Sequence, residues 1–361
     1  KLLNGNNKEA IAEASKILQD GGLVAFPTET VYGLGADALN ADAAAKIYAA
    51  KGRPSDNPLI VHIADTNAVE KLADLETMNR THPDMVKKAH MLMEAFWPGP
   101  LTIIFPKLAI VPDGTTGGLP TVAIRMPSHP IAQELIRTSG VSIAAPSANT
   151  SGRPSPTTAQ HVWEDMDGRI EMILDGGAVG IGIESTIVDM TGTIPTILRP
   201  GFITKTMLSE IVGDVTIDPA IIEPDPNLRP KAPGMKYTHY APHGTLSIVE
   251  AAADESANRA SLHSGVKVSY NATEAETLRV AEKIKALVNE KEAQGYKVAI
   301  LTTKEHASLY KNYSHVLIVG EGNKGQTISA RLYAALRECD SEQMEYMYSE
   351  AFDQNELGVA I

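Results

Sequence analysis

Apolar residues along the first 200 positions repeat with helical spacing in some segments and fill short continuous runs in others. The segment 7–20 predicts a helix, because Ile11, Ala14 and Leu18 share one face, and Leu23–Phe26 predicts a short buried strand. Further helices are predicted over 41–51, 85–96 and 130–138, and further strands over 59–63, 101–105, 121–126, 141–145, 170–174, 185–190 and 196–199. This alternation predicts an α/β domain over residues 1–212, with a mixed sheet flanked by helices.

Residues 213–244 have a different character. The stretch "DPAIIEPDPNLRPKAPGMKYTHYAPHG" contains six prolines and no extended apolar run, so we interpret the segment as a linker. Beyond it, strands are predicted over 245–249, 297–301 and 315–319, and helices over 273–291 and 328–337. Residues 245–361 are therefore expected to form a smaller α/β domain with an open, Rossmann-like sheet.

Composition narrows the class of protein. The formal net charge is −12, which leaves no overall basic surface for a nucleic acid, and we expect no strong direct nucleic-acid binding. The single cysteine, Cys339, rules out an internal disulfide and a cysteine-rich zinc site. No apolar run approaches the ~20 residues that span a bilayer, and the first residues lack a signal-peptide pattern. We therefore expect a cytoplasmic protein that does not bind membranes.

Polar side chains gather at the predicted strand ends and in short loops. The stretches are "PTETVYGLGAD", "KGRPSDNPLIVHI", "TVAIRMP", "PSANTSGRPSPTT", "GIESTIVD" and "ILRPG". Together they bring Lys51, Arg53, Arg125, Arg153 and Arg199 into an otherwise acidic domain. Ligands of open α/β sheets bind where such loops meet, and these cations suit phosphate oxygens.

Each residue alone also suits a structural role. Thr28 and Thr30 could cap backbone groups in a turn, and Lys51 could simply stabilise the end of a helix. The common nucleotide signatures are absent, because "GLGAD" is not a phosphate loop and no GxxxxGK[ST] occurs.

The motifs taken together resemble those of the YrdC/YciO family. "KGR" at 51–53 with "SAN" at 147–149 is similar to that family's KxR…SxN signature, and "PTETVYGLG", "WPGPLT", "ESTIVD" and "LRPG" occur in the expected order. "PGMKYTHYAP" at 233–242 resembles the linker of the family's longer, two-domain synthase form.

The resemblance implies a nucleotidyltransferase, an L-threonylcarbamoyladenylate synthase on a twisted mixed sheet. Such an enzyme makes threonylcarbamoyl-AMP and pyrophosphate from L-threonine, bicarbonate and ATP. Mg²⁺ would accompany ATP. The product would pass to the machinery that transfers the threonylcarbamoyl group to tRNA, giving t6A.

The resemblance also implies roles for residues. The catalytic group would be Lys51, Arg53, Ser147 and Asn149. ATP would be bound by Arg53, Asn57, Thr121, Ser147, Asn149, Ser155, Arg199, Tyr237 and Tyr240. Threonine would be bound by Thr30, Tyr32, His62, Arg125, Ala145 and Ser185. No protein ligand for a metal is assigned.

The linker carries a further hypothesis. It would fold over the site as a lid, with Tyr237 or Tyr240 touching the nucleotide, whereas the alternative is a linker docked permanently on the surface. An RNA-binding or regulatory YrdC-like module without synthase activity is the alternative function. Another carbamoyl-transfer enzyme, as in hydrogenase maturation, is disfavoured because acylphosphatase-like and zinc-finger segments are absent.

Overall fold

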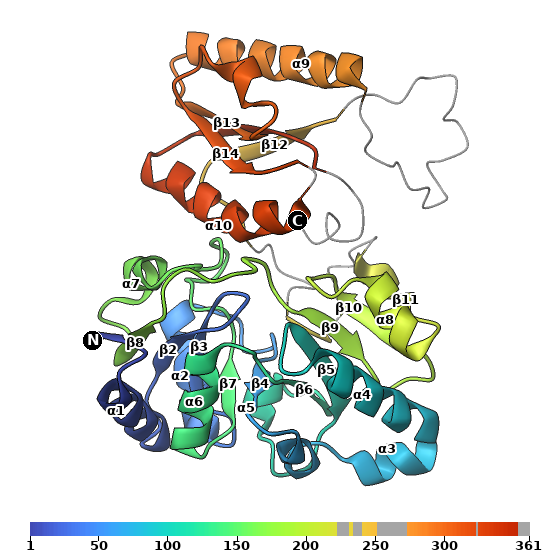
Figure 1. Cartoon of the computed structure of the whole chain (residues 1–361). Coiled ribbons are helices and arrows are strands. Elements are labelled where there is room, and N and C mark those ends of the chain that lie inside the picture. Colours follow the sequence, from blue (N-terminus) through green and yellow to red (C-terminus); the bar gives the residue numbers. More distant parts are fainter. Residues whose placement is uncertain (222–230, 234–239, 251–272, 323, 353–361) are drawn as a thin grey trace. The chain divides into compact units, whose positions relative to one another are not determined.

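A computed structural model describes residues 1–221, 231–233, 240–250, 273–322 and 324–352 (Figure 1). The chain divides into two compact units, Lys1–Tyr240 and Ala241–Ile361, and each is described by itself. The division falls inside the segment 213–244 that the sequence marks as a linker. The start of that segment is not a linker, because β11 (Thr216–Ile217) pairs with β10 (Thr196–Arg199).

The first unit alternates helices and strands along the chain. Its remaining strands are β1 (Leu2–Asn4), β2 (Val24–Pro27), β3 (Tyr32–Asp37), β4 (Ile60–His62), β5 (Leu101–Pro106), β6 (Thr121–Arg125), β7 (Ile143–Ala145), β8 (Met172–Asp175) and β9 (Thr186–Asp189). Its helices are α1 (Lys8–Gln19), α2 (Ala41–Lys51), α3 (Leu75–Thr81), α4 (Pro83–Phe96), α5 (Asp113–Thr116), α6 (Pro130–Ser139), α7 (Ala159–Met166) and α8 (Lys205–Val212), with 3₁₀ turns η1 (Thr66–Lys71) and η2 (Pro219–Ile221).

These strands form one sheet in the order β1-β8-β2-β3-β7-β4-β6-β5-β9-β10-β11. Neighbouring strands are parallel in some pairs, such as β4 with β6, and antiparallel in others, such as β5 with β6. This confirms the predicted α/β class with a mixed, helix-flanked sheet.

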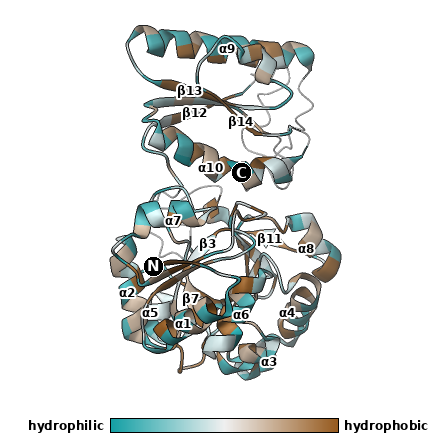
Figure 2. Ribbon diagram, turned by 60° about the vertical axis from the view of Figure 1, so that its left-hand side comes forward, coloured by the Kyte–Doolittle hydropathy of each residue, from teal (hydrophilic) through white to brown (hydrophobic). Residues whose placement is uncertain are grey.

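Alternation along the strands separates two hydrophobic layers. In β2, Val24 and Phe26 face the core that α1 and α6 cover, and Ala25 faces the larger core beneath α2, α4, α7 and α8. Figure 2 shows the same division, with hydrophobic strands between helices whose outer sides are hydrophilic. Because side chains alternate along a strand, a residue's parity fixes the face it occupies.

The register of four central strands aligns the polar residues that matter below. His62 of β4 lies opposite Arg125 of β6, and Arg125 lies opposite Thr102 of β5. Ile60, two residues before His62 and so on the same face of β4, pairs with Ala145 of β7. Ala145 belongs to the core covered by α1 and α6, so the row of His62, Arg125 and Thr102 lies on the α1/α6 face of the sheet. Cross-strand neighbours lie about 5 Å apart, which brings residues distant in sequence into contact.

The second unit is a four-stranded parallel sheet in the order β12-β15-β13-β14. The strands are β12 (Thr245–Val249), β13 (Val298–Thr303), β14 (Val316–Gly320) and β15 (Tyr346–Glu350), and the helices are α9 (Glu274–Ala293), α10 (Gly325–Ser341) and the 3₁₀ turn η3 (Ala307–Tyr310). Helices α9 and α10 cover opposite sides of the sheet (Figure 1). This matches the expected open-sheet α/β domain.

Several elements were not predicted. The glycine-rich stretch at 32–37 is strand β3, and "YMYSE" at 346–350 is the inner strand β15. Helices α3, α7 and α8 were also missed. Among the described residues, none of the helices is both long and apolar enough to cross a membrane.

Candidate active site

A cleft lies in the first unit, and His62 and Arg125 of the row defined by the sheet register line it. It is bordered by the loop after β2, the end of helix α2, the ends of β4 and β6, the loop after β7 and the segment before β9. Its lining residues are Thr28, Thr30, Val31, Gly33, Lys51, Arg53, Ile60, His62, Arg125, Ala145, Pro146, Ser147, Asn149, Ser151, Gly152, Glu184, Ser185, Arg199, Pro233 and Tyr240.

Lys51 sits at the last position of helix α2 and is buried. Its Nζ donates hydrogen bonds to the backbone carbonyls of Ser147 and Asn149 in the loop after β7. The hydroxyl of Ser147 in turn donates to Asn149 Oδ1 at 2.5 Å. Lys51, Ser147 and Asn149 therefore form one hydrogen-bonded group, with a buried cation whose charge is stabilised by carbonyl dipoles.

Arg53 follows Lys51 and also enters the cleft. Its Nε and NH2 donate to the carbonyls of Asn57 and Pro58, at 3.2 and 3.0 Å. The pKa of Arg53 is lowered to about 10, mainly by burial and also by the charge of Arg199, while Tyr48, Tyr240 and Asp56 act in the opposite direction. Two guanidinium groups thus share one partly desolvated region, which favours an anion between them.

A carboxylate and a phenol complete this end of the cleft. Glu184 accepts a hydrogen bond from the buried hydroxyl of Ser155 at 2.6 Å. Tyr240 forms a side-chain hydrogen bond with Arg199, and burial, together with the charge of Glu184, raises the pKa of the Tyr240 phenol. Tyr240 therefore stays neutral at physiological pH and offers a hydroxyl to this end of the cleft.

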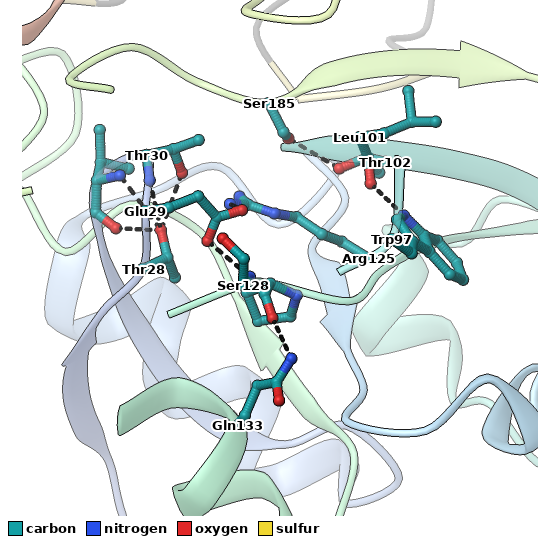
Figure 3. Close-up of polar contacts among 12 residues, drawn as sticks. Thr28, Glu29, Thr30, Trp97, Leu101, Thr102, Arg125, Ser128, Gln133 and Ser185 are labelled. Atoms are coloured by element: carbon teal, nitrogen blue, oxygen red, sulfur yellow. Dashed lines mark hydrogen bonds and ion pairs between the residues drawn. The ribbon is translucent and has the colours of Figure 1, made fainter. Parts of the chain in front are cut away.

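The other end of the cleft is built around Arg125 (Figure 3). Arg125 NH2 lies 2.7 Å from Glu29 Oε1, while its Nε is buried and has no hydrogen-bond partner in the part of the chain that the structure describes. Nearby, the hydroxyl of Ser185 is 2.8 Å from that of Thr102 and accepts from Arg199 NH2 at 3.1 Å. This end thus presents a guanidinium and hydroxyls, which suit a small carboxylate ligand.

His62 lines the cleft beside Arg125, its partner across the sheet, and is held neutral. Burial, with the neighbouring charge of Arg125, lowers its pKa to about 3. Its Nδ1 is 3.1 Å from the carbonyl of Ile60, and a carbonyl only accepts, so Nδ1 carries the proton. The Nε2 atom is then an acceptor, and the ring packs edge-on against Phe26.

Arg153 has a structural explanation. Its NH1 lies 2.5 Å from Oδ1 of Asp165, a buried residue of helix α7 that does not line the cleft. The other oxygen of Asp165 accepts from the backbone N of Thr150 at 3.1 Å. The carbonyl of Arg153 accepts from Asn149 Nδ2 at 2.9 Å. Asp165 therefore fixes the loop that orients Asn149.

Comparison with known proteins decides the family. Residues 16–201 match the Sua5/YciO/YrdC family model, described as "Telomere recombination", and residues 203–361 match the one described as "Threonylcarbamoyl-AMP synthase, C-terminal domain". The threonylcarbamoyl-AMP synthase of Bacillus subtilis is 45% identical over 356 residues, which cover 98% of this chain and 91% of the relative. The chain belongs to the threonylcarbamoyl-AMP synthase family.

Two further comparisons support the assignment to threonylcarbamoyl-AMP synthases. The threonylcarbamoyl-AMP synthase of Pyrococcus abyssi is 40% identical over 361 residues, covering 99% of this chain and 94% of the relative. The crystal structure of P. abyssi Sua5 complexed with L-threonine aligns with a TM-score of 0.84 and 39% identity, covering 100% of this chain and 95% of that one.

The structure brings most of the residues assigned from the sequence to one place. Those that line the cleft are Thr30, Lys51, Arg53, His62, Arg125, Ala145, Ser147, Asn149, Ser185, Arg199 and Tyr240. Ser155 does not line the cleft itself, but its hydroxyl donates a hydrogen bond to Glu184, which does. Asn57 is buried next to Arg53, and its Oδ1 has no partner among the described residues. Tyr237 lies outside the described residues.

Besides Asn57 and Ser155, two more assigned residues, Tyr32 and Thr121, do not line the cleft. The Tyr32 hydroxyl donates to the carbonyl of Gly177 at 2.7 Å and accepts from the backbone N of Gly176 at 3.1 Å, so this buried side chain supports the turn after β8. Thr121 starts β6, at the end opposite Arg125. Their assignment to threonine and to ATP therefore lacks support from the geometry.

Sequence reasoning assigned no role to three acidic residues. Glu29 and Glu184 lie inside "PTETVYGLGAD" and "GIESTIVD", but a search for phosphate-binding cations gives carboxylates no role. Asp165 lies in a helix that was not predicted. Thr28, in contrast, has the structural role that was considered, because its hydroxyl donates to the carbonyl of Val31 at 2.6 Å.

The loop contact of Asp165 leads to a first prediction. Asp165→Asn removes the charge that holds Arg153, so Asn149 loses its fixed orientation and ATP affinity falls about tenfold, typical of coupling within one hydrogen-bond network. Calorimetric titration with ATP and with threonine measures it, and threonine affinity stays unchanged. Asp167→Asn, at an exposed position of the same segment, is the control. Equal losses for both ligands would contradict a role specific to this loop.

The buried His62 gives a second prediction. In the unfolded chain His62 takes up a proton at the ordinary histidine pKa of 6.5, whereas in the folded chain its pKa is about 3. Between these two pH values the unfolded chain binds more protons, so the unfolding free energy decreases as the pH falls from about 6.5 to about 3. His62→Asn should reduce the pH slope of the unfolding free energy by about 1 kcal/mol per pH unit between about pH 6 and pH 4. Urea denaturation at several pH values measures this slope. Exposed His90→Asn is the control, and an unchanged slope in His62→Asn would refute the burial of a neutral ring.

Proposed function

We propose that this chain is an L-threonylcarbamoyladenylate synthase that converts L-threonine, bicarbonate and ATP into threonylcarbamoyl-AMP and pyrophosphate. The observation that carries the proposal is one cleft with two chemically distinct ends. One end holds Lys51, Arg53 and Arg199, and the other holds Arg125 with nearby hydroxyl groups. The similarity to threonylcarbamoyl-AMP synthases over nearly the whole chain supports the same activity.

Threonine is placed at the end that contains Arg125. Its carboxylate suits the guanidinium, whose buried Nε has no protein partner among the described residues. The hydroxyl groups of Thr30 and Ser185 line the same region and can bind the substrate hydroxyl. The threonine complex of the 39% identical P. abyssi Sua5 supports this choice of substrate.

ATP is placed at the end that contains Lys51, Arg53 and Arg199. These cations provide the positive charge that phosphate oxygens need, and Ser147 and Asn149 add neutral hydrogen-bonding groups. Asn57, with its unpartnered buried Oδ1 in the described part of the chain, lies beside Arg53 and can accept from a nucleotide amine or hydroxyl.

The chemistry then takes two steps. The threonine amine attacks the carbon of bicarbonate to give a carbamate and water. A carbamate oxygen then attacks the α-phosphorus of ATP and releases pyrophosphate. Positioning and charge neutralisation supply most of the catalysis in such a transfer, which suits a cleft rich in cations. The carbamate is labile in water, so a closed site protects it.

Magnesium enters the proposal together with ATP. Among the described residues there is no group of three or more histidines, cysteines or acidic residues that could hold a metal ion. The protein therefore fits an ion carried by phosphate oxygens and water, and its own cations bind the phosphates that remain exposed.

The linker and the product complete the proposal. Tyr240 contacts Arg199 at the cleft, in keeping with a linker that covers the nucleotide, and a neutral phenol suits contact with an anion. The threonylcarbamoyl-AMP would pass to the enzymes that transfer the threonylcarbamoyl group to tRNA.

Pyrophosphate release tests the function and gives a third prediction. Release by the purified chain should require ATP, threonine and bicarbonate together. Lys51→Ala and Arg53→Ala should each lower turnover by about 2–4 kcal/mol of transition-state stabilisation, because they remove a cation from a desolvated site. Lys46→Ala, at an exposed position of the same helix, should behave as wild type. The proposal would be refuted if pyrophosphate were released at the same rate with and without threonine, or if both site variants kept full activity.

A further inference from the structure

Glu29 follows strand β2, and its carboxylate contacts the guanidinium of Arg125, which lines the threonine end of the cleft (Figure 3). Its Oε1 lies 2.7 Å from Arg125 NH2, and its Oε2 accepts from the backbone N of Ser128 at 3.1 Å. The side chains of Arg125 and Glu29 are only 5% and 13% exposed. The carboxylate is therefore held in one orientation, in a region where charges interact strongly.

Glu29 occupies only part of the guanidinium of Arg125. The Nε of Arg125 is buried without a partner among the described residues, so a donor remains after Glu29 is bound. A ligand carboxylate can therefore add to Arg125 while Glu29 keeps its contact. A buried donor without a partner costs free energy, which the ligand would recover.

The charges then point to the ligand's second group. The charges of Glu29 and Arg125 cancel, and both side chains are largely buried. A ligand carboxylate that binds Arg125 therefore adds one negative charge that this pair does not compensate. In an α-amino acid the ammonium group is separated from the carboxylate by a single carbon. The ammonium is therefore close enough to neutralise Glu29, and the four charges alternate in sign.

We propose that Glu29 binds the α-ammonium group of threonine and accepts its proton. This inference rests on the proposed function and adds the group that makes the amine nucleophilic. The N–H bond breaks, an O–H bond forms on Glu29, and the nitrogen keeps its electron pair. The neutral amine then attacks bicarbonate to give the carbamate and water, and Glu29 returns its proton to solvent after product release.

A competing role is purely positional, with Glu29 acting only by orienting Arg125. The two roles differ in how binding depends on the amine. L-threonine and 3-hydroxybutyrate share the carboxylate, the hydroxyl and the methyl group, but the second lacks the ammonium. A residue that contacts the ammonium affects threonine alone, whereas a residue that orients Arg125 affects both.

The experiment is a calorimetric titration of the full chain with each compound, for wild type and Glu29→Gln. Losing the charge on one partner of a buried pair should weaken threonine binding by about 30-fold and 3-hydroxybutyrate binding by less than about threefold. Glu29→Asp keeps the charge and should recover part of the threonine affinity. Glu134→Gln, the same change at an exposed position of α6, should leave both affinities unchanged.

Each result decides the proposal. A selective loss for threonine supports it, together with lower turnover at saturating threonine. Equal losses for both compounds, or no loss for either, would overturn it while leaving the proposed function intact. If wild type binds no threonine, the proposed function fails and this inference fails with it.

Discussion

The cross-strand register of β7, β4, β6 and β5 is the constraint on which the candidate site depends. His62, Arg125 and Thr102 come from distant parts of the sequence, yet pairing places them in one row on one face. If one of these strands paired with its neighbour one residue out of register, the polar side chain that the strand contributes would point to the opposite face of the sheet. There it would enter the apolar core beneath α2 and α4. The apolar residues of each strand fix the register, and the register fixes the chemistry.

The first unit also contains several cations at and near the cleft, which are balanced either by backbone carbonyls or by carboxylates. Lys51 is stabilised by backbone carbonyls, Arg125 by the carboxylate of Glu29, and Arg153 by Asp165. His62 avoids charge altogether, because burial and Arg125 lower its pKa to about 3. The cleft thus keeps its cations where anionic substrates are expected, within a chain whose net charge is −12.

Local signals in the sequence predicted much of this arrangement. Helix α2 has the bounds predicted for it, 41–51. In the structure Asn40 caps its start and Gly52 ends it in the left-handed conformation. Strand β3 was missed because its glycines resemble a turn. A Cβ on Gly35 would come within 2.7 Å of Ile143 and 2.8 Å of Phe26, so packing between strands, and not turn geometry, requires glycine there. The cations of the site were found by composition and by family resemblance, whereas the carboxylates that hold them depend on tertiary contacts that no local pattern records.

The most direct test of this account is a crystal structure of the full chain with L-threonine and a non-hydrolysable ATP analogue. The account predicts the threonine carboxylate on Arg125 and the nucleotide phosphates beside Lys51, Arg53 and Arg199, with both ligands in one cleft. Threonine bound away from Arg125, or a nucleotide bound outside this cleft, would contradict it.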